Sequence, residues 1–206
     1  MKKDKGSLFV VSAPSGAGKT TLCQKLSSIL PDLQHSVSYT TRPVRTGEVN
    51  NRDYTFVSGK VFRNMTDKGD FIEWAKVHGH LYGTSRKRLE EMLRKGISVI
   101  LDIDTQGARQ IRKKYDGGVY IFILPPSLEV LKERLNRRMS NSKQEIEERL
   151  MRAVEEIKDY KKYDYVIIND IFEDALEQLK SIVFLEKVRT KNIDPLWIKE
   201  NFFRLG

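Results

Sequence analysis

The chain has 206 residues, of which 39% are hydrophobic and 32% charged, so it can bury a sizeable core and bulk disorder is not expected. Its formal net charge of +9 suits a nucleic acid, a membrane surface or a small polyanionic substrate, and charge alone does not choose among them. The single cysteine, Cys23, excludes an intrachain disulfide and a cysteine-based zinc cluster, and three histidines argue against a histidine-rich metal site.

Apolar runs are too short for membrane insertion or secretion. The longest, residues 119–124, falls far short of the roughly 20 residues that span a bilayer. The run at residues 8–11 is shorter than the roughly 7–15 residues of a signal-peptide core. We therefore expect a cytoplasmic protein, and the length predicts one domain, residues 1–206.

Short β-branched runs alternate with segments of helical periodicity along the chain. Continuous apolar character indicates strands covered on both faces, at residues 8–11, 97–101, 119–124 and 165–168. Helices are predicted at residues 19–30, 86–95, 105–114, 127–138, 143–160 and 171–189. This order predicts an α/β fold in which a parallel sheet is flanked by crossover helices, over residues 7–35, 86–134 and 150–190.

Three segments depart from this pattern. Residues 36–85 contain short, partly alternating strands at 36–40, 54–57, 71–77 and 80–82 and a short helix at 61–68, which predicts a small inserted mixed β subdomain. A capping box from Ser142 to Glu145 predicts a helix start after a polar break. Arginines flank this break, and such a connection, at about residues 135–149, could close over phosphates as a helical lid. The tail, residues 191–206, carries apolar side chains, and we expect a docked terminal helix there.

The sharpest motif matches the phosphate-binding loop G-x-x-x-x-G-K-[ST], with alanine in place of the first glycine. Gly16 and Gly18 allow consecutive backbone N–H groups to wrap around a phosphate, and a predicted strand and helix flank the loop. Lys19 can then reach the β- and γ-phosphates, and the Thr20 hydroxyl can bind Mg²⁺. The predicted ATP-binding residues of this segment are Ala13, Pro14, Ser15, Gly16, Ala17, Gly18, Lys19, Thr20 and Thr21.

Two charged sets accompany the loop. Asp102 ends a predicted strand, where nucleotide kinases hold Mg²⁺ through water, although Asp102 and Asp104 could equally be turn and helix-cap residues. Arg134, Arg138 and Arg149 flank the predicted helix break. They fit a solvated helix face, or groups that neutralise charge on a transferring phosphoryl group.

The inserted segment carries its own candidates. Arg42 and Arg45, with hydroxyls around them, would make a second phosphate site. Glu73 lies in an apolar run, where a carboxylate usually needs a partner, and a purine with N–H donors would be one. The alternative is an edge-strand glutamate that points to water.

In order and spacing, these motifs resemble those of the guanylate kinase family. The most specific strings are T-T-R-x-x-R-x-G-E, within residues 38–48, and D-I-D-x-Q-G, residues 102–107, and the resemblance covers about residues 7–186. It implies a P-loop NTPase-type core with a GMP-binding insertion and a lid. It also implies Mg²⁺-dependent transfer of the γ-phosphoryl group of ATP to GMP or dGMP, in guanine nucleotide synthesis and recycling.

The resemblance also implies roles for single residues. The GMP-binding positions would be Ser38, Arg42, Arg45, Tyr54, Glu73, Tyr82, Thr84 and Asp104. Thr20 and Asp102 would hold Mg²⁺ through water, and Asn169 would border the adenine. The catalytic residues would be Lys19, Arg42, Arg134, Arg138 and Arg149.

Three other functions stay open. A non-catalytic module of this family would bind protein ligands, but such modules tend to lose loop or lid residues, and Lys19, Asp102 and Arg149 are present. A second possibility is another small-molecule kinase of the same fold. The third, a nucleic-acid binder, rests on the basic charge alone. With GMP and ATP as substrates, we expect no nucleic-acid, membrane or obligate protein partner.

Overall fold

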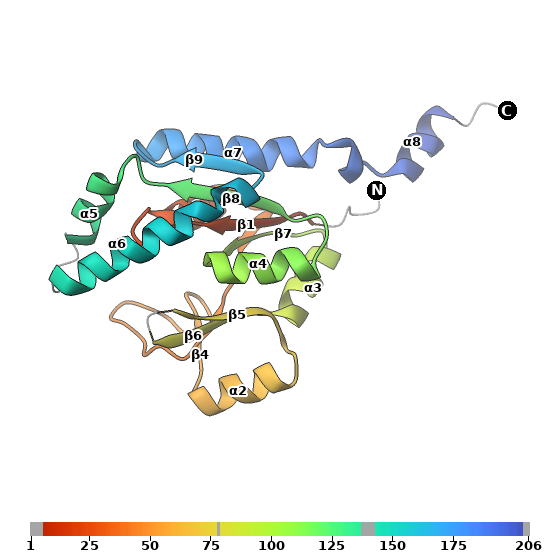
Figure 1. Ribbon diagram of the computed structural model, residues 1–206. Coiled ribbons are helices and arrows are strands. Elements are labelled where there is room, and N and C mark those ends of the chain that lie inside the picture. The colour runs from red at the N-terminus through yellow and green to blue at the C-terminus, as the bar shows by residue number, and fades with distance from the viewer. Residues whose placement is uncertain (1–5, 78, 137–142, 204–206) are drawn as a thin grey trace.

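The computed structural model describes residues 6–77, 79–136 and 143–203, and its centre is a five-stranded sheet (Figure 1). Every strand pair in this sheet is parallel, and the strand order is β2-β7-β1-β8-β9. The strands are β1 (Leu8–Ser12), β2 (Leu33–His35), β7 (Ser98–Asp102), β8 (Val119–Leu124) and β9 (Tyr165–Ile168). The α/β prediction is confirmed, and the three-residue β2, which pairs with β7, was not predicted.

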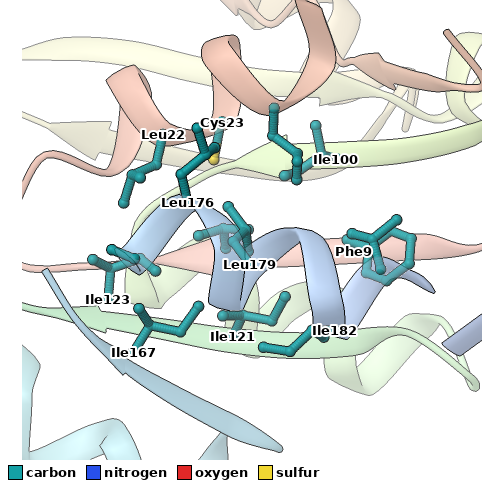
Figure 2. Close-up of a cluster of buried hydrophobic side chains, with 14 of the residues drawn as sticks. Phe9, Leu22, Cys23, Ile100, Ile121, Ile123, Ile167, Leu176, Leu179 and Ile182 are labelled. Carbon is teal, nitrogen blue, oxygen red and sulfur yellow. The ribbon is translucent and has the colours of Figure 1, made fainter. Parts of the chain in front are cut away.

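Helices cover both faces of β1, β7 and β8, which explains the continuous apolar character of these strands. The prediction of two-sided burial is wrong for the edge strand β9, where Ile167 is buried but Val166 and Ile168 are exposed. In β1, Phe9 and Val11 face a cluster beneath α1 and α7 (Figure 2), whereas Leu8 and Val10 face a second cluster beneath α3 and α4. The helices of the described chain are α1 (Lys19–Ile29), α2 (Gly59–Asp67), α3 (Arg86–Arg94), α4 (Thr105–Lys114), α5 (Leu128–Asn136), α6 (Lys143–Ile157), α7 (Phe172–Lys187) and α8 (Pro195–Phe202). Short 3₁₀ helices lie at Lys158–Lys162 and Thr190–Asn192.

A second sheet of four strands lies beyond α4, away from the core sheet (Figure 1). Its order is β4-β3-β6-β5, with β3 and β4 parallel and the other pairs antiparallel. The strands are β3 (Tyr39–Thr40), β4 (Thr55–Phe56), β5 (Phe71–Val77) and β6 (His80–Ser85). The predicted small mixed sheet is therefore confirmed.

Side chains of α4 pair with the outer edge of β5, where a further strand would otherwise add. Gln110 accepts from the Trp74 N–H at 3.2 Å and donates to the Trp74 carbonyl at 2.6 Å. Lys114 Nζ donates to the Ile72 carbonyl at 2.8 Å. These contacts join the second sheet to the core on both sides of Glu73.

The two helices near the predicted lid share a small apolar core. Leu131 and Leu135 of α5 pack with Ile146 and Ala153 of α6, and all four are buried. The predicted helix start at Ser142 and the polar break lie outside the described residues, as does Arg138. α6 ends at Ile157, three residues before its predicted end, and continues as a 3₁₀ helix.

The tail forms a helix, but the prediction that it docks is wrong. No residue of α8 is buried, Trp197 and Phe202 are exposed, and the helix extends past the end of the sheet (Figure 1). Asp194 caps its first turn, and the Trp197 and Phe202 rings pack on each other at 5.7 Å. The ring contact accounts for Trp197 and Phe202, whereas Leu196 and Phe203 remain exposed. In the described ranges, no helix combines the length and apolar character that crossing a membrane requires.

Candidate active site

The predicted phosphate loop joins β1 to α1, at the carboxyl edge of the core sheet. Gly16 and Gly18 have φ values of 99° and 89°, a left-handed conformation that glycine adopts at little cost. Gly18 is the residue before the first turn of α1, so the free N–H groups of that turn lie at the end of the loop. This strand–loop–helix arrangement suits an anion.

Lys19 and Asp102 meet beneath the loop. The Lys19 ammonium pairs with Asp102 and donates to the Ile103 carbonyl at 2.9 Å. Burial by itself would raise the pKa of Asp102, but the charge and hydrogen bond of Lys19, with a hydrogen bond from Thr20, hold it below its usual value. Asp102 is therefore anionic beside the Thr20 hydroxyl, and hard oxygen donors of this kind suit Mg²⁺.

Two of the predicted arginines reach the loop region. Arg149 Nη2, from α6, donates to Ser15 Oγ at 2.7 Å, and Arg134 Nη2, from α5, donates to the Asn169 carbonyl at 2.9 Å. The Asn169 side chain is buried, and its Nδ2 donates to the Ala17 carbonyl at 2.7 Å. The geometry thus brings residues from three distant parts of the chain to one loop.

A second cationic site forms in the four-stranded sheet. Arg42 is only 7% exposed, donates to Glu48 Oε1 at 2.6 Å and lies 5.3 Å from the centre of the Tyr54 ring. The Tyr54 and Tyr82 rings contact edge to face at 5.9 Å. Arg45 is exposed, and its backbone N–H donates to Glu48 Oε2 at 2.8 Å. Four predicted acceptor-site residues therefore lie together: Arg42 and Arg45 on the Glu48 carboxylate, and Tyr54 and Tyr82 beside the Arg42 guanidinium.

The carboxylate of Glu73 is 3% exposed and faces α4. Thr84 Oγ1 donates to Glu73 Oε1 at 2.5 Å. Burial raises the pKa of Glu73 to about 7, although the hydrogen bond from Thr84 opposes that shift. Glu73 is thus a buried carboxyl group with a raised pKa, and the alternative of an edge-strand glutamate that points to water is excluded.

A single segment connects these sites. Asp102 pairs with Lys19, and Asp104 caps α4 by accepting from the Gly107 N–H at 2.8 Å. A Cβ placed on Gly107 would lie 2.5 Å from Glu73 Oε2, so glycine leaves the space that this carboxylate fills. Ser38, the remaining predicted residue, is half-buried beside β4, and its carbonyl accepts from the Thr55 N–H at 2.8 Å.

The sequence assigned no role to three residues of this region. Glu48 and Gly107 each end one of the two specific strings, which was the available signal. Glu156 of α6 accepts from the Ser15 N–H, and burial first, then the Asp104 charge, raises its pKa to about 7. No motif in the sequence linked Glu156 to the phosphate loop.

Comparison with known proteins agrees with this arrangement. A family model described as guanylate kinase matches residues 5–186. The chain is 57% identical to a guanylate kinase of Geobacter metallireducens over 188 residues, which cover 91% of this chain and 93% of that one. It is 53% identical to a guanylate kinase of Geobacter sulfurreducens over 191 residues, 93% of this chain and 94% of that one.

A solved structure extends the comparison to the fold. The guanylate kinase of Anaplasma phagocytophilum superposes with a TM-score of 0.82 at 36% identity, and the match covers 100% of both chains. The expected P-loop NTPase-type fold is thereby confirmed. By sequence over nine-tenths of its length and by fold, the chain belongs to the guanylate kinase family.

Proposed function

We propose that this chain transfers the γ-phosphoryl group of ATP to GMP or dGMP, giving ADP and the diphosphate, with Mg²⁺. The observation that carries the proposal is the segment from Asp102 to Gly107. Its first carboxylate pairs with the phosphate-loop lysine, and its last residue packs on the buried carboxylate of Glu73. The proposed donor-phosphate and purine sites would thus be joined by one short segment, from the end of β7 to the first turn of α4. The names of the relatives support the same reaction.

Selection of guanine would rest on Glu73. When ionised, its carboxylate can accept from both N–H donors of a guanine edge, N1–H and the exocyclic amine. Adenine has an acceptor at N1, so it would leave this buried carboxylate partly unpaired. A site built to hydrogen-bond its substrate in this way can reject an analogue by roughly 10⁴-fold.

The GMP phosphate would bind at Arg42 and Arg45, beside the hydroxyls of Tyr54 and Tyr82. Glu48 supports this assignment because it holds the Arg42 guanidinium in place and bonds the Arg45 backbone. A guanidinium that is already oriented loses less conformational entropy when it binds the phosphate.

On the donor side, the loop N–H groups and Lys19 would bind the β- and γ-phosphates. Mg²⁺, held by Thr20 and by Asp102 through water, would supply charge neutralisation on those phosphates. The oxygen donors of this pair fit the ion, and their number fits its preference for one or two carboxylates plus substrate oxygens. In-line placement and charge stabilisation then account for the catalysis, because phosphoryl transfer needs little covalent chemistry from the protein.

We further propose that two segments of the chain close over the substrates while the core stays fixed. Residues 36–85 would close over GMP, and the lid, about residues 135–149, would close over ATP and bring Arg138 and Arg149 to the transferring group, next to Arg134 at the end of the core. Closure would exclude water and prevent hydrolysis of ATP. The core, residues 7–35, 86–134 and 150–190, would stay rigid. We place this activity in the cytoplasm, with no protein partner needed.

Coupled ADP release tests the proposal, with GMP, dGMP, AMP, CMP and UMP as acceptors. We expect turnover with GMP and dGMP and only background with the other three. A GMP rate no higher than the rate without acceptor would refute the proposal. Turnover with AMP equal to that with GMP would remove Glu73 from base selection, and loss of turnover on chelation of Mg²⁺ is expected throughout.

A further inference from the structure

Asn169 occupies a fixed point at the end of the core sheet. It follows the last residue of β9, its side chain is 5% exposed, and its backbone N–H donates to the Leu124 carbonyl at 2.7 Å, at the end of β8. A buried amide needs hydrogen-bond partners, and the partners that it has indicate what it holds in place.

The side-chain amide of Asn169 binds the phosphate loop. Nδ2 donates to the Ala17 carbonyl at 2.7 Å, across 152 positions of sequence. In a planar trans peptide, a carbonyl and the following N–H point in opposite directions. Holding the Ala17 carbonyl against Asn169 therefore turns the Gly18 N–H toward the opposite side of the loop. Backbone N–H groups of such a loop are the donors that it offers to a phosphate.

The second glycine of the motif is matched to this contact. Gly18 has a φ of 89°, which favours glycine by itself. In addition, a Cβ at Gly18 would collide with Nδ2 of Asn169. The bare backbone at Gly18 thus allows the amide to pack directly against the loop.

The main chain of Asn169 carries a second contact. Its carbonyl accepts from Arg134 Nη2 at 2.9 Å, so a cationic side chain of α5 ends on the same residue. A hydrogen bond from a guanidinium is stronger than one between neutral groups. Asn169 consequently links three elements: the loop through its side chain, α5 through its carbonyl, and β8 through its N–H.

We infer that Asn169 is a positioning residue for the donor phosphates. It holds the Ala17–Gly18 peptide so that the loop is preorganised for a polyphosphate, and it acts through the loop and not through the base of the nucleotide. The inference rests on the proposed function, since it requires that the loop bind ATP. It differs from the role implied by family resemblance, in which this asparagine borders the adenine.

The test compares polyphosphate binding with base binding. Wild type, Asn169→Ala and Asn169→Asp are titrated calorimetrically with ATP, ADP, inorganic tripolyphosphate and adenosine in buffer that contains Mg²⁺. For Asn169→Ala we expect affinity for ATP and for tripolyphosphate to fall by the same factor, about tenfold, as for one buried hydrogen bond. The affinity of Asn169→Asp for both ligands should fall at least as far, because this substitution places a carboxylate against the Ala17 carbonyl.

The control is Asn64→Asp, the same chemical change at an exposed position of α2, and it should leave every affinity unchanged. In the Asn169 variants, KM for GMP should also stay within twofold of wild type. A general structural defect would instead weaken GMP and ATP alike, and that result would overturn the inference. If Asn169→Ala fails to fold, the isosteric Asn169→Asp carries the comparison.

Two further outcomes separate the inference from the proposed function. A loss of ATP affinity with tripolyphosphate binding unchanged would show a contact with the base and would overturn the inference alone. Unchanged affinity for both ATP and tripolyphosphate would also overturn the inference alone. A wild-type protein that binds neither ATP nor tripolyphosphate would overturn the inference together with the proposed function.

Discussion

Replacing Gly107 by alanine separates the acceptor site from the stability of the fold. The new methyl carbon would lie 2.5 Å from Glu73 Oε2 and 3.3 Å from Asp104 Oδ1. The first separation is far inside van der Waals contact, so the Glu73 carboxylate has to move by roughly 1 Å. Glycine 107 has an ordinary helical φ within α4, where alanine favours the helix by roughly 0.5–1 kcal/mol. The variant should therefore fold normally.

We expect the Gly107→Ala substitution to weaken the recognition of guanine. Hydrogen bonds to a charged group are worth about 1.5–3 kcal/mol each, and displacement of the carboxylate removes at least one from guanine. We expect kcat/KM for GMP to fall roughly 10- to 150-fold, with most of the change in KM for GMP and little in KM for ATP.

Steady-state kinetics by coupled ADP release and a thermal melt measure both effects. The control is Gly59→Ala, at the first position of α2, where the nearest atom to a new Cβ is a flexible arginine tip at 3.8 Å. It should leave kcat/KM unchanged. A Gly107→Ala enzyme with wild-type kcat/KM for GMP would show that Glu73 can be displaced without loss, and it would refute the reasoning.

The remaining predictions concern Lys19, Glu48 and Glu73. Lys19→Met should lower kcat about 10²- to 10³-fold and leave GMP affinity intact, which fluorescence titration with GMP checks, and a selective loss of GMP binding would contradict the assigned role. Glu48→Gln should raise KM for GMP about tenfold without changing KM for ATP, because Arg42 loses the carboxylate that orients it; equal changes in both would argue for a general defect. Burial raises the pKa of Glu73 to about 7, and guanine binds the ionised form, so GMP affinity should be nearly full at pH 8 and about tenfold lower at pH 6. This pH dependence of GMP affinity should disappear in Glu73→Gln. An identical pH profile in both proteins would show that Glu73 is not the group that titrates.

Local sequence determined those parts of the protein whose conformation depends on neighbouring residues along the chain. The loop conformation at Gly16 and Gly18 follows from the motif, because glycine permits the positive φ values that the turn needs. The strands β1, β7 and β8 follow from continuous apolar runs, because both of their faces are covered, whereas the edge strand β9 buries Ile167 alone. The small second sheet was visible in its short, partly alternating strands, which indicate a half-exposed sheet.

Long-range contacts escaped the same reasoning. β2, Leu33–His35, has no apolar run of its own and becomes a strand because it pairs with β7. The tail sequence contains apolar side chains, but only the assembled structure shows that no residue of α8 is buried and that the Trp197 and Phe202 rings pack on each other. Periodicity records what a segment could bury and carries no information on which surface is available to bury it.

The same distinction between local sequence and tertiary structure applies to the functional site. Sequence supplied the chemical groups: a phosphate loop, an acid after a strand, arginines and one carboxylate in an apolar run. The tertiary structure decided their partners, since it set the Asn169 amide on the Ala17 carbonyl and the Glu73 carboxylate against Gly107. Such pairs join residues many positions apart, so their distances depend on the packing of the sheet and α4, which no local pattern encodes.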